Sequence, residues 1–107
     1  MKTLTNLAGS VATGDSIADA VVVYHDALVA RELAVVIEIP VVGDDVPVRR
    51  ASLAVGWLTQ LVATPAPRAG RDVEDATTVN SLHAMALALP LSTFYARASY
   101  IVRRPPM

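Results

Sequence analysis

A chain of 107 residues has the size of one ordinary globular domain and can bury a hydrophobic core without disulfides. The absence of cysteine excludes a disulfide framework, a thiolate nucleophile and a thiolate metal site, and it favours a reducing compartment such as the cytoplasm. Nine basic and ten acidic side chains give a net charge of -1, so we expect no nucleic-acid partner. No apolar run approaches the roughly 18 residues of a membrane span, so we expect no membrane association.

A helix is the clearest element of the sequence. We expect it to run from Ser16 to Arg31, with Ser16 or Asp15 as its N-cap; the Ser16 cap places Asp19 at the third helical position, where a carboxylate favours the positive helix end. Four apolar side chains recur at spacings of four, three and four and define the buried stripe: Ile17, Val21, Tyr24 and Leu28.

Two pairs of extended segments flank this helix. Residues 2–6 and 10–13 predict a short N-terminal hairpin. Residues 33–42 and 48–55 alternate in polarity and predict a longer antiparallel hairpin that turns at residues 43–45. In the first long strand we expect one face in the core, comprising Leu33, Val35, Ile37, Ile39 and Val41, and the other face only partly covered.

The C-terminal half predicts a further strand, a connector and a second helix. Residues 57–64 are expected to continue the meander, with Trp57 filling the core, and residues 65–71 to form a surface connector. A helix is then expected from Asp72 until Pro90 stops it. Its apolar stripe consists of Val79, Leu82, Ala86 and Leu89.

The last segment is ambiguous. Residues 91–102 fit both a strand and a helix, with a slight preference for a strand, and residues 103–107 are expected to form a frayed tail. Taken together, the sequence predicts a single α+β domain over residues 1–107. Its small antiparallel sheet of three to five strands, in β-β-α-β-β order, is expected to pack against the two helices.

Three side chains are candidates for a functional site: Glu38, Tyr24 and His83. Glu38 interrupts an apolar strand, where it either pairs with Arg49 or Arg50 across the hairpin or is desolvated with a raised pKa. Tyr24 is expected in the core, and neither His83 nor His25 has a partner at metal-ligand spacing. The sequence therefore predicts no catalytic, cofactor-binding or metal-binding residue and no cofactor, and it leans away from an enzyme.

Three short segments carry a resemblance. They resemble short uncharacterised α+β proteins of high-GC Gram-positive bacteria, and they are Thr13 to Val21, Glu38 to Val41 and Gln60 to Ala63. The resemblance covers about the first two-thirds of the chain and implies a small β-β-α-β-β fold in a bacterial protein. It implies no functional residue. The eight Arg against one Lys agree with a high-GC coding bias.

Strong core patterning without an assembled site predicts a small cytoplasmic, non-enzymatic protein that self-associates or binds a protein partner. Apolar residues make up 53% of the chain and the mean hydropathy is +0.45, so surplus apolar surface predicts a homodimer. Its interface is expected on the second face of residues 33–42 or on residues 94–102, which contain Phe94, Tyr95 and Tyr100. Alternatively, Ala and Val raise the apolar count without forming a patch.

A second hypothesis is a small ligand-binding or enzymatic α+β barrel dimer, in which Glu38, Tyr24 or His83 would line a cavity. Two of these side chains within hydrogen-bond reach of each other would favour this hypothesis, whereas a filled core would favour the first.

Overall fold

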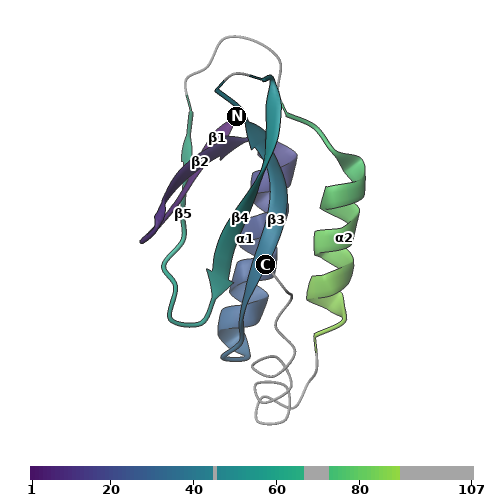
Figure 1. Cartoon of the computed structure of the whole chain (residues 1–107). Helices are drawn as coiled ribbons and strands as arrows, with labels where there is room; N and C mark the ends of the chain where they lie inside the picture. Colours follow the sequence, from purple (N-terminus) through teal and green to yellow (C-terminus); the bar gives the residue numbers. More distant parts are fainter. Residues whose placement is uncertain (45, 67–72, 90–107) are drawn as a thin grey trace.

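A computed structural model describes residues 1–44, 46–66 and 73–89, which form five strands and two helices (Figure 1). In chain order the elements are β1 (Lys2–Asn6), β2 (Gly9–Thr13), α1 (Asp15–Ala30), β3 (Ala34–Val42), β4 (Val48–Gly56), β5 (Val62–Pro65) and α2 (Ala76–Leu87). The predicted α+β class is confirmed. The ambiguous residues 91–102, the predicted tail 103–107 and most of the connector lie outside the described residues.

The five strands divide between two antiparallel sheets. β1 lies between β2 and β5 in a three-stranded sheet, and β3 pairs with β4 in a long hairpin. The prediction that residues 57–64 continue the meander beside β4 is wrong, because β5 pairs instead with β1, with Thr64 opposite Thr3. The cause lies in the turn after β4: Gly56 has φ 107° and Leu58 has φ 68°, and these left-handed residues turn the chain away from the hairpin.

A buried hydrogen bond joins the two sheets. The Thr13 hydroxyl at the end of β2 donates to the Pro40 carbonyl in β3 over 2.8 Å. In an antiparallel strand the N–H and C=O of one residue point to the same edge. The Pro40 carbonyl faces β2, so the Pro40 nitrogen, which carries no hydrogen, also faces β2. It does not face Arg50, the residue opposite it in β4. A proline is thus accommodated inside a strand without breaking the β3–β4 ladder.

The helix α1 begins at Asp15 without a side-chain cap, so the predicted caps, Ser16 or Asp15, are wrong. Cations at the start of β1 engage the first two turns of the helix. The terminal amino group of Met1 lies 2.8 Å from the Asp15 carboxylate, and Lys2 Nζ donates to Asp19 Oδ1 over 2.6 Å. These carboxylates consequently bind the first strand and do not reach back to their own helix amides.

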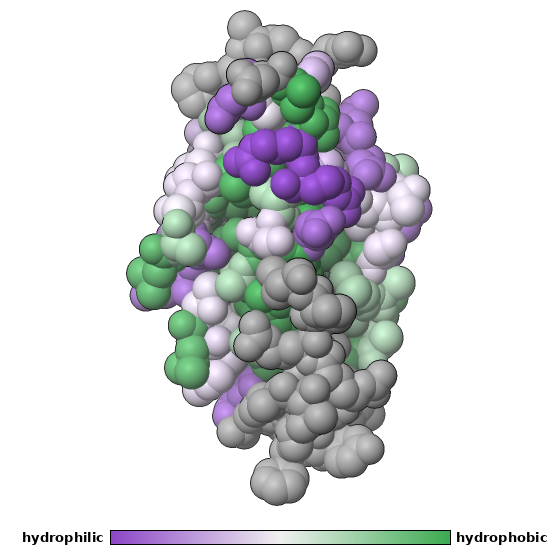
Figure 2. Space-filling model, in the orientation of Figure 1, coloured by the Kyte–Doolittle hydropathy of each residue, from purple (hydrophilic) through white to green (hydrophobic). Residues whose placement is uncertain are grey.

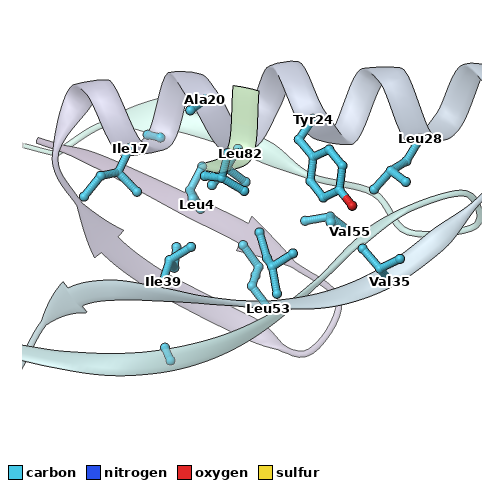
Figure 3. Close-up of a cluster of buried hydrophobic side chains, with 14 of the residues drawn as sticks. Leu4, Ile17, Ala20, Tyr24, Leu28, Val35, Ile39, Leu53, Val55 and Leu82 are labelled. Carbon is cyan, nitrogen blue, oxygen red and sulfur yellow. The ribbon is translucent and has the colours of Figure 1, made fainter. Parts of the chain in front are cut away.

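The core lies between α1 and the two sheets, and Figure 3 shows its side chains pointing toward one another from these elements. Every residue of the predicted α1 stripe is buried, as are the predicted core positions of β3. The partners contributed by the other elements are Leu4 from β1, Ala51, Leu53 and Val55 from β4, and Leu82 from α2. Both predicted core faces are confirmed.

The helix α2 begins at Ala76, four residues later than predicted from Asp72, which lies outside the described residues. Asp75 is the N-cap and accepts a hydrogen bond from the Thr78 N–H over 3.2 Å. Val73, just before it, is buried, so core packing holds this part of the chain outside the helix. Of the predicted stripe, Leu82 is buried and Val79 and Ala86 are partly buried on α2, which packs against α1. Leu89 is also buried but lies beyond the end of the helix at Leu87. Within the described residues, neither helix has the length and apolar character needed to cross a bilayer.

Candidate functional site

The three candidate side chains lie in different environments. Glu38 is exposed on the outer face of β3, where its Oε1 lies 3.4 Å from Arg50 Nε, as expected for a cross-strand pair. Tyr24 is 2% exposed and belongs to the core, pointing from α1 toward the hairpin (Figure 3). His83 is on the exposed side of α2. The fold therefore does not assemble them into one site.

A polar groove of about 400 Å³ lies between the hairpin and the N-terminal half of α2. Its polar lining consists of Glu38, Arg50, Asp75, Thr77, Thr78 and Ser81. Figure 2 shows hydrophilic side chains gathered over this part of the hairpin. The Thr78 N–H holds the pKa of Asp75 below its usual value, and the charge of Arg50 contributes in the same direction. Asp75 is thus an ionised helix cap at neutral pH and a poor general acid.

No group of three or more His, Cys, Asp or Glu side chains within residues 1–44, 46–66 and 73–89 is placed to hold a metal ion.

A larger groove of about 750 Å³ lies where the chain leaves β4 and returns as β5. We call it the apolar groove; it is lined by His25 and Val29 of α1 and by residues 56–62. Its exposed apolar side chains are Val29, Trp57, Leu58 and Val62, with exposed fractions of 37%, 39%, 84% and 53%. The prediction that Trp57 fills the core is wrong, because the turn at Gly56 carries the ring to the surface.

The turn beneath this groove is held by backbone hydrogen bonds. The Trp57 N–H donates to the Leu33 carbonyl over 2.7 Å, and the Thr59 N–H donates to the Gly56 carbonyl over 3.1 Å. Leu58 lies between these bonds in a left-handed conformation that is unusual for a branched side chain. The strained backbone of Leu58 and the exposure of its apolar side chain both cost stability. Such strain clusters at functional positions.

His25 forms the inner wall of the apolar groove. Its side chain is 8% exposed, and its Nδ1 accepts a hydrogen bond from the Gly56 N–H over 2.8 Å. Burial lowers the pKa of His25, and the charge of Asp26 opposes this effect more weakly. Because Nδ1 accepts, the proton of the neutral ring is on Nε2. A neutral histidine thus ties α1 to the end of β4 at the edge of the core.

The strand β5 continues the apolar groove along the margin of the three-stranded sheet (Figure 1). All four of its residues are exposed, and the chain carries no charged side chain from Trp57 to Ala66. Sequence reasoning missed this surface because it assigned Trp57 to the core. The available signal was an apolar run with weak alternation and without the charged residues that flank the other strands.

No family model, no curated protein and no solved structure matches this chain. The resemblance to proteins of Gram-positive bacteria stays a prediction.

Proposed function

We propose that this chain is a small non-enzymatic protein that acts by self-association, using the apolar groove and β5 as its contact surface. One observation carries the proposal: Val29, Trp57, Leu58 and Val62 expose apolar side chains on a single groove whose lining segment has no charge.

Exposed apolar side chains that gather on one surface are typical of protein interfaces. Interface centres are depleted in charged residues, and tryptophan is among the side chains that contribute most to binding. Trp57 and Leu58 fit this description, since the turn from Gly56 holds them at the surface. Edge strands that avoid association usually carry lysine or other charges, and β5 carries none.

The placement of the other candidates supports a binding role over a catalytic one. Tyr24 packs in the core, Glu38 pairs with Arg50, and His83 is on the exposed side of α2. Two of the three within hydrogen-bond reach would have favoured an enzyme or a small-molecule carrier. The proposal also places the homodimer in a bacterial cytoplasm, on the basis of the cysteine-free, Arg-rich composition.

Light scattering behind a sizing column tests self-association. We expect the mass to rise from the 11.3 kDa monomer toward twice that value as the loaded concentration increases from about 5 to about 500 µM. Leu58→Asp should keep the protein monomeric over this range, because it places a charge on the contact surface.

Leu7→Asp is the matched control, since Leu7 is 87% exposed in the turn between β1 and β2 and does not line the apolar groove. It should associate like the unmodified chain. A mass that stays monomeric at every concentration would overturn the proposal. Equal dissociation by both substitutions would show that the added charge, and not its position, is responsible.

A further inference from the structure

We infer that two copies of this chain join edge to edge through β5, antiparallel about a two-fold axis at Ala63, so that their three-stranded sheets form one continuous sheet. This inference rests on the proposed function, because it names the seam through which self-association would occur.

The register of β5 shows which backbone groups face outward. The Ala66 N–H donates to the Met1 carbonyl over 3.1 Å, at the end of the ladder that β5 forms with β1. Because successive residues of a strand point to opposite edges, Thr64 also bonds toward β1 while Ala63 and Pro65 point away. The absence of an N–H at Pro65 therefore removes nothing from the β1 ladder.

A second copy of β5 satisfies these outward groups. With Ala63 opposite its counterpart, each Ala63 N–H donates to the other Ala63 carbonyl. Two residues away, Leu61 of one copy lies opposite Pro65 of the other, so the Leu61 N–H meets the Pro65 carbonyl. In this register every outward N–H from Leu61 to Pro65 has an acceptor. The single missing donor, at Pro65, shortens the seam without interrupting it.

The side chains at this seam are compatible with their own copies. The two-fold axis places Val62 beside Thr64 of the second copy, on the outer face that also carries Thr3 and Thr5. Such β-branched pairs favour sheet pairing. No charge lies between Trp57 and Ala66, so the two copies meet without like-charge repulsion, and a charged partner strand would find no counter-charge there.

The size of the seam sets the expected affinity. Four residues span only about 13 Å, so the backbone seam alone buries far less than the roughly 800 Å² per partner of a standard interface. The neighbouring apolar groove must contribute area through Trp57 and Leu58. We therefore expect a weak dimer with a Kd on the order of 10 to 100 µM.

A charge exchange across the seam tests the register. In Val62→Lys/Thr64→Lys each lysine faces a lysine of the second copy, and the Kd should rise at least about tenfold. In Val62→Lys/Thr64→Glu each lysine faces a glutamate, and the Kd should return to within about threefold of the unmodified value. Sedimentation equilibrium measures each Kd, circular dichroism verifies that each variant is folded, and Leu7→Lys is the exposed control.

Amide hydrogen exchange gives a second readout that needs no substitution. The Ala63 N–H should become protected as the concentration passes the Kd, whereas the Thr64 N–H, bonded to β1, should be protected at all concentrations. If the chain dimerises but both charge variants dimerise equally well and Ala63 stays unprotected, the β5 seam is wrong while self-association stands. If the unmodified chain is monomeric throughout, both are wrong.

Discussion

The two sheets of this protein have similar strand patterns but very different burial. In the β3–β4 hairpin one face is closed by α1, and Ile39, Val41 and Val55 are completely buried. In the three-stranded sheet only Leu4 and Thr13 are buried among the strand residues, and β5 is exposed throughout. The hairpin therefore supplies most of the strand residues of the core, whereas the second sheet supplies one, Leu4. Among the described residues, no further strand pairs with the outer edge of β5.

This difference in burial separates the strands that stabilise the fold from the strand that can contact a partner. A strand whose apolar face is fully covered contributes to the free energy of unfolding and has little left to offer a partner. A strand such as β5 contributes little to the core and retains its apolar side chains and backbone groups for contact. The comparison predicts that equivalent truncations in the two sheets have unequal effects.

The largest expected effect is in the hairpin. Ile39→Ala should lower the free energy of unfolding by about 2–5 kcal/mol, because it leaves a cavity at a fully buried position. Val62→Ala in β5, where the side chain is 53% exposed, should change it by less than about 0.5 kcal/mol. Urea denaturation at a concentration below the Kd of the dimer measures both values. Similar losses at the two positions would contradict the division of roles.

The two sheets also differ at their positive-φ glycines. Gly56, with φ 107°, ends β4 so close to the Leu33 carbonyl oxygen that an added Cβ would overlap it. Gly9, with φ 146°, begins β2 with open space around the position of a Cβ. Gly56→Ala should therefore cost about 2–4 kcal/mol and Gly9→Ala about 1–2 kcal/mol, the difference being the steric term. Equal costs in thermal unfolding would show that the β4 turn relaxes around the new methyl group.

Much of the hairpin half could be predicted from the sequence because its signal is local. Alternation identifies the two strands of the hairpin and the buried face of β3, and helical spacing identifies the stripe of α1. The placement of β5 could not be read in this way, because its partner is decided by backbone geometry at Gly56 and Leu58. The prediction of the α1 cap is wrong for a similar reason, since Asp19 binds Lys2 from a different element and does not reach back to the helix amides.

The apolar groove could not be predicted from local sequence pattern for a related reason. Hydrophobicity alone does not distinguish a core tryptophan from an interface tryptophan, and Trp57 was assigned to the core for that reason. Nor does the sequence reveal that His25 accepts a hydrogen bond from Gly56, since the two residues lie 31 positions apart. Both features depend on how the chain leaves β4.

The histidine that joins α1 to this turn gives the protein a pH dependence. Burial lowers the pKa of His25 in the folded chain below its usual value of about 6.5. As the pH falls below about 6.5 the unfolded chain binds a proton first, so the free energy of unfolding should decrease until the folded pKa is reached and then level off. This window lies above the one in which Asp15 and Asp75, whose pKa values are lowered, lose their contributions.

Two substitutions isolate this effect. His25→Leu leaves the Gly56 N–H buried without an acceptor and should cost about 1–3 kcal/mol at pH 8. His25→Gln offers an uncharged acceptor and should cost less. Both should remove the His25 part of the decrease that begins below about pH 6.5, measured by chemical denaturation at each pH. A decrease of unchanged size in both variants would assign it to other groups.

The smallest effect is expected on the outer face of the hairpin. Glu38 and Arg50 form an exposed pair at 3.4 Å, with side-chain exposures of 62% and 53%. Water and salt screen such a pair, so Arg50→Ala should lower the free energy of unfolding by less than about 0.5 kcal/mol, and Glu38→Gln by a similar amount. A double-mutant cycle in about 0.05 M and 0.5 M salt measures the coupling, which should fall toward zero at the higher concentration. A salt-resistant coupling above about 1 kcal/mol would mean that the polar groove beside α2 shields the pair from solvent. The polar groove would then hold its charges in a fixed arrangement, and the outer face of β3 would compete with β5 as the surface on which a partner is recognised.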